Sequence, residues 1–528
     1  MKLTSACIIL TATGLVSAQF APKPKGKCLP GTSPSGVKNV VLLISDGFGP
    51  ASQTTARTFF QARDKLPYEW KSPLDDIIVG TVRTKAYDNW ITDSASAATA
   101  YACGVKTFNA GIGVTFDNQN CPTILEAAKR SGLRTGLVTT TRVTHATPAG
   151  FAAHVPERDW EALIAQQLIG DNPTGGRELD VLFGGGASYF FPNTTKGSKR
   201  DDARDLHAEA TTKFGWKNVA TTRAQFDAVP SDKSALPLLA TFTNSHMNYE
   251  IDRNSTLEPS LADMTKKALD TLKDGSENGK GFFLMVEGGR IDHAGHINDP
   301  AGHLHDIKAY WDTLELVKKF ADEDGNTLVI HVSDHETGGL TVARQMNANQ
   351  KDGATDDSGS WPYRWFPEAL FKATASTEKL AGLIRAEAKA NPAGDLVTYA
   401  KNLVVKSYGI DVKDEEITNL IAALKRERGS TQFTEWALGE LLNSRAELGW
   451  TTHGHSGVDV LLGTYGRTGA SIRGSYENTE ISTIIQQRLN LDLGTVKFAY
   501  PPPPMPAPEA LARRAEKKAQ EHAYGLHN

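Results

Sequence analysis

Residues 39–47 read NVVLLISDG, a continuous run of apolar, mostly β-branched residues that stops at an acid and a glycine. Helical patterns such as CPTILEAAKRSG and LADMTKKALDTL separate four similar runs: RTGLVTTTRVTHATP (134–148), GFFLMVEGGRIDH (281–293), TLVIHVSDHETGG (327–339) and VDVLLGTYG (458–466). Apolar strands that alternate with helices are typical of a mostly parallel sheet covered on both faces. The sequence therefore predicts an α/β fold, a three-layer sandwich, with a ligand site beyond the carboxyl ends of the strands.

The overall composition excludes some classes of partner. The 528 residues are 40% apolar and 22% charged, and the formal net charge is −4. This chain lacks the basic field that binding to nucleic acid or to an anionic membrane surface requires. Small ligands, neutral or anionic, remain as candidates.

The N-terminus has the features of a secretory signal. Residues 1–18 combine Lys2, an apolar run and a small-residue ending, and a Pro/Lys spacer follows. Cys103 and Cys121 are close enough in sequence to form a disulfide in an oxidising compartment, which leaves Cys28 unpaired in the mature chain. Sequons at Asn193 and Asn254 fit the same compartment. We expect a glycoprotein without a membrane anchor that is either secreted or kept in a lumenal or vacuolar compartment.

The body of the chain divides into segments of different composition. Residues 19–345 and 450–500 carry the strand and helix pattern of one catalytic α/β domain, and residues 501–528 form a Pro-rich charged tail. Residues 346–449 are mostly helical and are predicted to be an insertion over the sheet edge or the site mouth. Within the insertion, four apolar residues share the spacing of one buried helix face that ends at Gly429: Ile417, Leu420, Ile421 and Leu424.

Acids and histidines follow the ends of the predicted strands. Asp292 and His296 are four residues apart, so both side chains lie on one face if the segment is helical. An Asp-Gly pair such as Asp46-Gly47 is by itself more often a turn than a ligand. Carboxylates with imidazoles form a zinc-type ligand set, however, and together these residues indicate a metal site: Asp46, His145, Thr147, Glu287, Asp292, His296, Asp334, His335 and His455. We expect His303, His305, His331 and His453 to lie at the surface, in the core or beside the ligands instead of binding metal.

The stretch ITDSASAATA (91–100) places Ser94 at the start of a helix of small residues. A capping serine is the default interpretation, with a contribution of about 1 kcal/mol. A helix N-terminus also stabilises an anion, and a nearby divalent metal would labilise the hydroxyl proton. Ser94 is therefore also a candidate nucleophile.

The residues around Ser94 resemble a known signature. TDSASAATAYACGVK (92–106) resembles the nucleophile motif of alkaline phosphatases. The segments ISDGFGP, RVTHATPAG, VEGGRIDHAGH, VSDHETGG and THGHSGVDV resemble the metal motifs of that family in the same order. The resemblance runs from about residue 39 to about residue 465, the helical insertion excepted.

This resemblance implies a phosphate monoesterase that forms a phosphoserine on Ser94, with two Zn²⁺ and one Mg²⁺. It implies one zinc on Asp292, His296 and His455 and the other on Asp46, Asp334 and His335. Magnesium would share Asp46 with Glu287 and Thr147, with His145 nearby, and Arg158 would clamp the phosphate. The family also suggests a homodimer. Two positions depart from relatives: His293 replaces a bacterial lysine, and Thr243 replaces a glutamate of the animal calcium-type site, which argues against calcium.

Other functions remain open at this point. The same scaffold serves phosphodiesterases and sulfatases, although a sulfatase needs a Cys/Ser-x-Pro-x-Arg modification motif, and the Cys121-Pro122 pair does not make one. Diesterases usually carry threonine as the nucleophile, where this chain has Ser94. A glycoprotein without catalytic activity that binds metal or phosphate is the third alternative.

Overall fold

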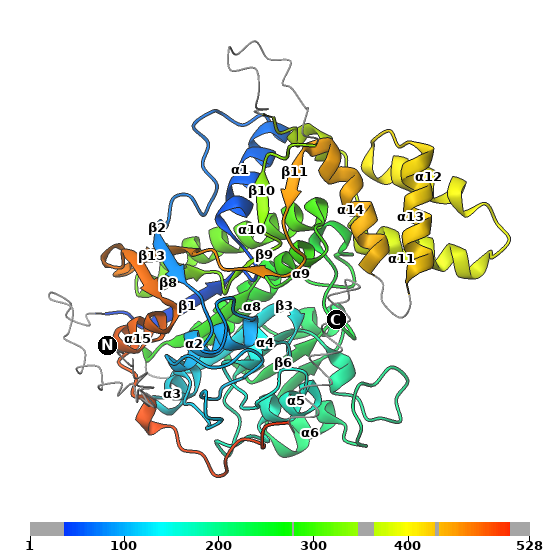
Figure 1. Cartoon of the computed structure of the whole chain (residues 1–528). Helices are drawn as coiled ribbons and strands as arrows, with labels where there is room; N and C mark the ends of the chain where they lie inside the picture. Colours follow the sequence, from blue (N-terminus) through cyan, green and yellow to red (C-terminus); the bar gives the residue numbers. More distant parts are fainter. Residues whose placement is uncertain (1–35, 277–278, 347–363, 428–431, 507–528) are drawn as a thin grey trace, which may run out of the picture. The chain divides into compact units, whose positions relative to one another are not determined.

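The computed structural model describes residues 36–276, 279–346, 364–427 and 432–506. The predicted signal segment, Cys28, Gly429 and most of the predicted C-terminal tail lie outside these residues. Figure 1 shows the chain coloured from its N-terminus to its C-terminus.

Within the described residues, ten strands form one sheet in the order β14-β2-β13-β8-β1-β7-β3-β4-β6-β5. All neighbours pair in parallel except β13, which runs antiparallel to both β2 and β8. The predicted, mostly parallel α/β sandwich is confirmed. The strands are β1 (Asn39–Ile44), β2 (Ile78–Arg83), β3 (Arg134–Arg142), β4 (Val181–Gly185), β5 (Asn218–Ala220), β6 (Leu238–Thr241), β7 (Phe282–Glu287), β8 (Thr327–Val332), β13 (Val460–Gly466) and β14 (Gly474–Glu477).

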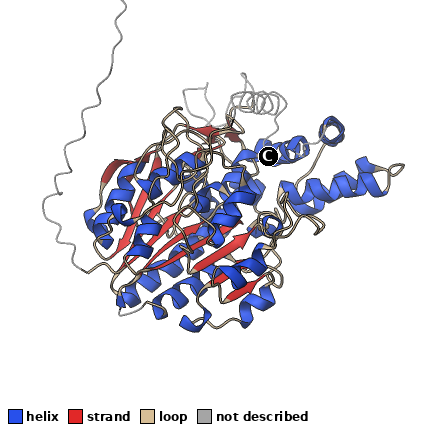
Figure 2. Cartoon of the chain, turned by 90° about the horizontal axis from the view of Figure 1, so that it is seen from below, coloured by secondary structure: helices blue, strands red, loops and turns tan. Residues whose placement is uncertain are grey.

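Helices cover both faces of the sheet, as Figure 2 shows from below. Along β1, Val41 and Leu43 point into one core, whereas Val40 and Leu42 point into the other. This alternation buries every residue of the strand and explains its continuous apolar sequence. The first core includes residues of α1 (Pro50–Arg63), α8 (Leu261–Asp274) and α10 (Pro300–Asp324). The second includes residues of α2 (Ser94–Cys103), α3 (Ile124–Arg130), α5 (Glu161–Ile169) and α15 (Asn478–Leu489).

Shorter elements complete this part of the structure. They are α4 (Ala146–Ala149), α6 (Leu206–Lys213), α7 (Arg223–Ala228) and α9 (Arg290–His296), with the strand pairs β9 (Glu336–Thr337) with β12 (His455–Ser456) and β10 (Leu340–Val342) with β11 (Leu448–Trp450). The disulfide between Cys103 and Cys121 is present, with 5.9 Å between the Cα atoms, and confirms that pairing. Asn193 and Asn254 are exposed. None of the helices in the described ranges is long and apolar enough to cross a membrane.

The segment between β10 and β11 is helical where it is described. It contains α11 (Thr377–Ala390), α12 (Leu396–Tyr408), α13 (Asp414–Arg426) and α14 (Gln432–Ala446), drawn in yellow and orange in Figure 1. Ile417, Leu420 and Ile421 are buried on α13, and Leu424 is partly buried against the same core. The start of α11 is attached to α10 because Asp299 accepts a hydrogen bond of 2.8 Å from the backbone N–H of Thr377. The predicted domain boundaries stay a prediction.

Candidate active site

The sheet brings the candidate acids to one edge. Ile44 at the end of β1 pairs with Glu287 of β7 on one side and with Val332 of β8 on the other. Asp46 and Asp334 each follow their strand by two residues, so the carboxylates of three strands converge. Gly47 has a φ of +75°, and a Cβ there would lie 2.6 Å from the Cα of Asp292. The turn after β1 therefore requires glycine to approach α9 closely.

Among the described residues, the candidate ligands form three groups in which one ligand atom per residue lies within 4.8 Å of the others. The groups are Asp292 with His296 and His455, Asp46 with Asp334 and His335, and Asp46 with His145 and Glu287. In the first group the Nε2 atoms of His296 and His455 are 3.1 Å apart, and His296 Nε2 lies 3.3 Å from Asp292 Oδ2. In the second, His335 Nε2 lies 3.1 Å from Asp334 Oδ2. Residues from five separate segments thus meet in one place.

Hydroxyl groups line the third group. Thr147, near the start of α4, donates a hydrogen bond of 3.4 Å to Asp46 Oδ2. Glu287 Oε2 accepts from Thr141 at 3.2 Å and from Thr139. Carboxylate and hydroxyl oxygens are the hard ligands that Mg²⁺ prefers, whereas the imidazole-rich first group suits zinc.

Several polar atoms at the sheet edge are buried without a hydrogen-bond partner. They include the carboxylate oxygens Asp46 Oδ1 and Glu287 Oε1. A buried acceptor without a hydrogen bond lowers the stability of the folded state, so its presence here needs an explanation. Cations between these groups would satisfy the free lone pairs and offset the negative charge, so the residues fit metal ions by their chemistry.

The carboxyl groups also perturb one another. Burial, followed by the charge of Asp334, raises the pKa of Asp46 well above its usual range. Burial likewise raises the pKa of Glu287 to about 7. Asp292 behaves differently: burial opposes its ionisation, but the neighbouring imidazoles, His296 first, hold its pKa well below the usual range. Without cations, this edge of the sheet keeps Asp46 and Glu287 from ionising readily.

Ser94 is the first helical residue of α2, and the cap is Asp93, not Ser94 as the default interpretation of the sequence had it. The Asp93 carboxylate accepts a 2.9 Å hydrogen bond from the backbone N–H of Ser96 and so supplies the capping bond. The Ser94 hydroxyl is consequently free of the capping role. Its Oγ lies 3.1 Å from His335 Nε2, in the second ligand group, and the residue is 1% exposed.

Arg158 lies across the same site. Its Nη1 donates to Asp93 Oδ2 and its Nη2 donates to His145 Nε2, each at 3.1 Å. Its side chain is only 18% exposed. The guanidinium is therefore fixed beside both the N-terminus of α2 and the third ligand group. Because guanidinium is a planar fork of N–H donors, this position suits an oxyanion such as phosphate.

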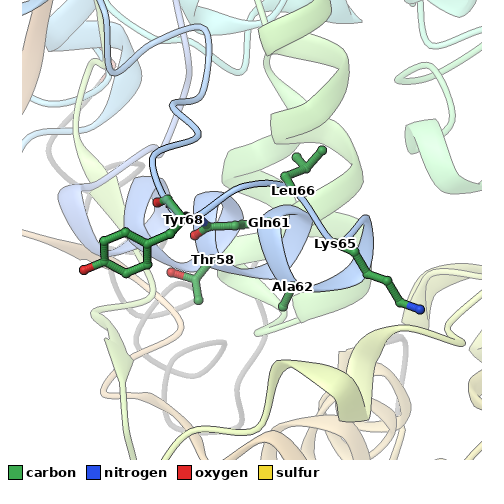
Figure 3. A pocket seen from close by; sticks show the side chains of 6 residues that line it. All are labelled: Thr58, Gln61, Ala62, Lys65, Leu66 and Tyr68. Carbon is green, nitrogen blue, oxygen red and sulfur yellow. Dashed lines mark hydrogen bonds between the residues drawn. The ribbon is translucent and has the colours of Figure 1, made fainter.

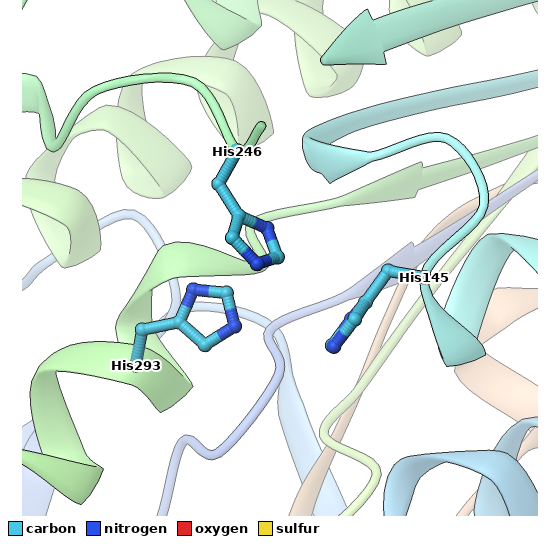
Figure 4. A group of neighbouring side chains, drawn as sticks. All are labelled: His145, His246 and His293. Carbon is cyan, nitrogen blue, oxygen red and sulfur yellow. The ribbon is translucent and has the colours of Figure 1, made fainter. Parts of the chain in front are cut away.

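Sequence reasoning did not single out His246. Its ring lies in a loop after β6, and together with His145 and His293 it forms a fourth group of ligand atoms within 4.8 Å of one another. Figure 4 shows these three rings gathered in one space. No motif surrounds His246 in the sequence, so only the fold places it here.

The four histidines that the sequence analysis did not count as ligands make contacts with neighbouring protein groups. His303 bonds to Ser52 and to the backbone of Ile291, and Tyr310 contacts His331 Nδ1 at 2.5 Å. His305 Nδ1 bonds to the carbonyl of Ala301, and His453 Nδ1 bonds to the carbonyl of His296. A hollow of about 530 Å³ beside α1, shown in Figure 3, contains none of the candidate residues. It is lined by Thr58, Gln61, Ala62, Lys65, Leu66 and Tyr68.

Comparisons with known proteins show the family of this chain. A family model described as alkaline phosphatase matches residues 37–491. The repressible alkaline phosphatase of Saccharomyces cerevisiae is 39% identical over 486 residues, covering 87% of this chain and 82% of the relative. The alkaline phosphatase of Schizosaccharomyces pombe is 38% identical with the same coverage. The crystal structure of Thermus thermophilus alkaline phosphatase superposes with a TM-score of 0.71 at 28% identity, covering 91% of this chain and 96% of that one. The chain therefore belongs to the alkaline phosphatase family, and it is an enzyme that hydrolyses phosphate monoesters.

Proposed function

We propose that hydrolysis proceeds through a covalent phosphoserine on Ser94, at a site that holds two zinc ions and one magnesium ion. The observation that carries the proposal is the position of Ser94: a buried hydroxyl at a helix N-terminus, 3.1 Å from His335 and clear of the capping role. A hydroxyl in that position has no evident structural function, whereas its place beside cation-type ligands favours nucleophilic chemistry.

The residues divide by chemistry into three ligand sets. Asp292, His296 and His455 would hold one zinc, and Asp46, Asp334 and His335 the second. Glu287 and Thr147 would hold magnesium together with Asp46, with His145 beside them. When bound, these cations supply positive charge that favours the alkoxide of Ser94 and the departing alcohol oxygen. The unpartnered carboxylate oxygens support the assignment, as does a histidine-to-glutamate mutant of the alkaline phosphatase from the Antarctic bacterium TAB5, which was solved with magnesium bound.

In the reaction, the Ser94 Oγ forms a bond to phosphorus while the bond from phosphorus to the alcohol oxygen breaks, and the proton that Ser94 loses is balanced by the proton that the departing alcohol gains. Water then displaces Ser94 from phosphorus, which releases inorganic phosphate and restores the hydroxyl. Arg158 holds two phosphate oxygens with its fork, and Asp93 fixes the orientation of that fork. The N-terminus of the ten-residue helix α2 adds a favourable dipole for the dianion.

The proposal extends to the oligomeric state of the protein and to the compartment in which it acts. We assign the exposed aromatic side chains of Tyr87, Trp90 and Phe116 to the contact face of a homodimer. Their exposed fractions are 59%, 81% and 55%, and the rings of Tyr87 and Phe116 stack at 4.6 Å. Secretion with removal of residues 1–18, and glycans on Asn193 and Asn254, complete the proposal. The final compartment is extracellular or lumenal.

Metal analysis of the purified protein tests the ligand division. We expect two zinc ions and one magnesium ion per chain, one zinc fewer in His455→Ala, and an unchanged zinc content in Arg158→Ala. Equal metal loss in both variants would contradict the division of roles. Parallel assays of p-nitrophenyl phosphate, its bis-ester and the sulfate should show a preference for the monoester that chelation abolishes.

A further inference from the structure

Arg290 connects the helical segment to the active site. It is the first residue of α9, and only 4% of it is exposed. Its guanidinium lies over the ring of Tyr249, with its carbon 3.8 Å from the ring centre. Nη2 donates to Glu378 of α11 at 2.8 Å, and Nη1 donates to His293 Nδ1 at 2.9 Å. One buried cation thus contacts both α11 and a histidine next to the ligand Asp292.

The contact with Arg290 fixes the tautomer of His293. A guanidinium in a protein is always protonated and can only donate hydrogen bonds. His293 Nδ1 must therefore accept, so the ring is neutral and carries its proton on Nε2. A histidine ring is usually oriented by an acceptor that takes its N–H. Here the orienting group is a donor, Arg290, so the other nitrogen of His293 carries the N–H.

That donor belongs to the group of three rings in Figure 4. The centroid of the His293 ring lies 5.5 Å from that of His145 and 4.2 Å from that of His246. Arg142 directs its Nη1 and its backbone N–H at the two nitrogens of His246. An arginine N–H lies at one nitrogen of His293 and at one nitrogen of His145, so the other nitrogen of each neutral ring carries the proton, and these two rings suit an anion or water better than a cation. His145 in turn accepts from Arg158, so the group adjoins the phosphate clamp.

We propose that Arg290 is a positioning residue that holds His293 as an Nε2–H donor toward the phosphate site, and that Glu378 of α11 fixes Arg290 in this role. The inference rests on the proposed phosphate site at Ser94 and Arg158. It gives the helical segment a function in the reaction: α11, which is attached to α10 through Thr377 and Asp299, tunes the affinity for phosphate.

The tautomer is measured directly on the metal-loaded protein labelled with ¹⁵N-histidine, with the His293 signals assigned by their loss in His293→Gln. We expect wild-type His293 to be protonated at Nε2 alone. In Arg290→Lys, which keeps the charge but cannot reach both partners with a fork, we expect the pure Nε2–H signature to be lost. A His293 protonated at Nδ1 in the wild type, or an unchanged signature in Arg290→Lys, would overturn the proposal.

Kinetics separate this role from a purely structural one. We expect the KM for p-nitrophenyl phosphate and the inhibition constant of inorganic phosphate to rise together, about tenfold in Arg290→Lys, the size of one hydrogen bond to a charged group. The kcat value should change less than threefold.

Glu378→Ala, whose side chain is 52% exposed and can be removed without opening the core, should show the same trend at about threefold. The matched control Glu387→Gln, on the same helix, changes a side chain that accepts a hydrogen bond from Asn391, four residues further on, and should behave as wild type. If kcat falls equally in Arg290→Lys and Glu378→Ala while the affinity for phosphate stays unchanged, the positioning role of Arg290 is refuted. Failure of phosphoserine formation would instead refute the proposed function and leave the tautomer result intact.

Discussion

Replacing Glu287 by glutamine should stabilise the metal-free protein at alkaline pH while it removes a magnesium ligand. Glu287 is completely buried at the end of β7, and one of its oxygens has no hydrogen-bond partner. Burial raises its pKa from 4.5 to about 7 in the folded, metal-free state. Glutamine has nearly the same shape and cannot ionise.

The magnitude follows from linkage. Between pH 4.5 and 7 the folded state retains a proton that the unfolded state releases, so the stability of wild type falls as the pH rises through this window. A shift from 4.5 to about 7 corresponds to about 3 kcal/mol, at 1.36 kcal/mol per pKa unit. The Glu287→Gln variant cannot ionise at this position, so its free energy of unfolding does not fall for this reason. We expect the two proteins to differ by less than about 1 kcal/mol at pH 5, and the variant to be more stable by about 3 kcal/mol at pH 8.

Urea unfolding of the chelator-treated proteins from pH 5 to pH 8, with the disulfide intact, measures the difference. Glu323→Gln, an exposed substitution of the same kind on α10, controls for the general effect of losing a carboxylate. Metal-loaded samples should show the opposite order at pH 8, because the variant has lost a ligand. If the metal-free variant is less stable than wild type at pH 8, or if the difference does not change with pH, the reasoning is wrong.

Three further predictions concern the phosphate clamp, a buried ion pair and the disulfide. Arg158→Ala should weaken phosphate inhibition about 10- to 100-fold, since hydrogen bonds to a charged group are lost, and a changed zinc content would contradict its assignment. Glu126→Gln should reduce the free energy of unfolding by about 3–5 kcal/mol, because His154 and Glu126 form a 2.7 Å pair that is fully buried. Burial lowers the pKa of His154, but the charge of Glu126 outweighs burial and raises this pKa above its usual value. The loss of unfolding free energy in the variant should therefore be largest at acidic pH and become smaller as the pH rises through the pKa of His154. A loss that does not change with pH would refute this explanation. Replacing Cys103 and Cys121 by serine should lower stability by about 3 kcal/mol, measured by urea unfolding, and an unchanged midpoint would exclude a stabilising role.

The sequence predicted the centre of the sheet better than its edges. β1, β7 and β8 are buried on both faces, so their mostly apolar runs were recognisable, and β3 shows a shorter apolar stretch between threonines. β5 is three residues long, and β14 is largely exposed, so neither carries such a signal. The antiparallel direction of β13 depends on its neighbours β2 and β8 and is not encoded in its own residues.

The candidate site shows a similar division. Asp46, Glu287 and Asp334 were predictable because the carboxyl ends of parallel strands meet at one edge. His246 was not, because its position depends on the path of a loop that no local pattern specifies. The capping role of Asp93 was also missed: Asp93 and Ser94 are both good caps in sequence terms, and only the backbone conformation decides between them.

The most direct test of the central claim is to trap the phosphoenzyme. The metal-loaded protein is incubated with ³²P-labelled monoester, quenched in acid and digested, and the labelled peptide is identified, with Ser94→Ala treated in parallel. The account predicts up to one phosphoryl group per chain, located on Ser94, and no label in Ser94→Ala although its zinc content equals that of wild type. Label on another residue, or label that persists in Ser94→Ala, would contradict it.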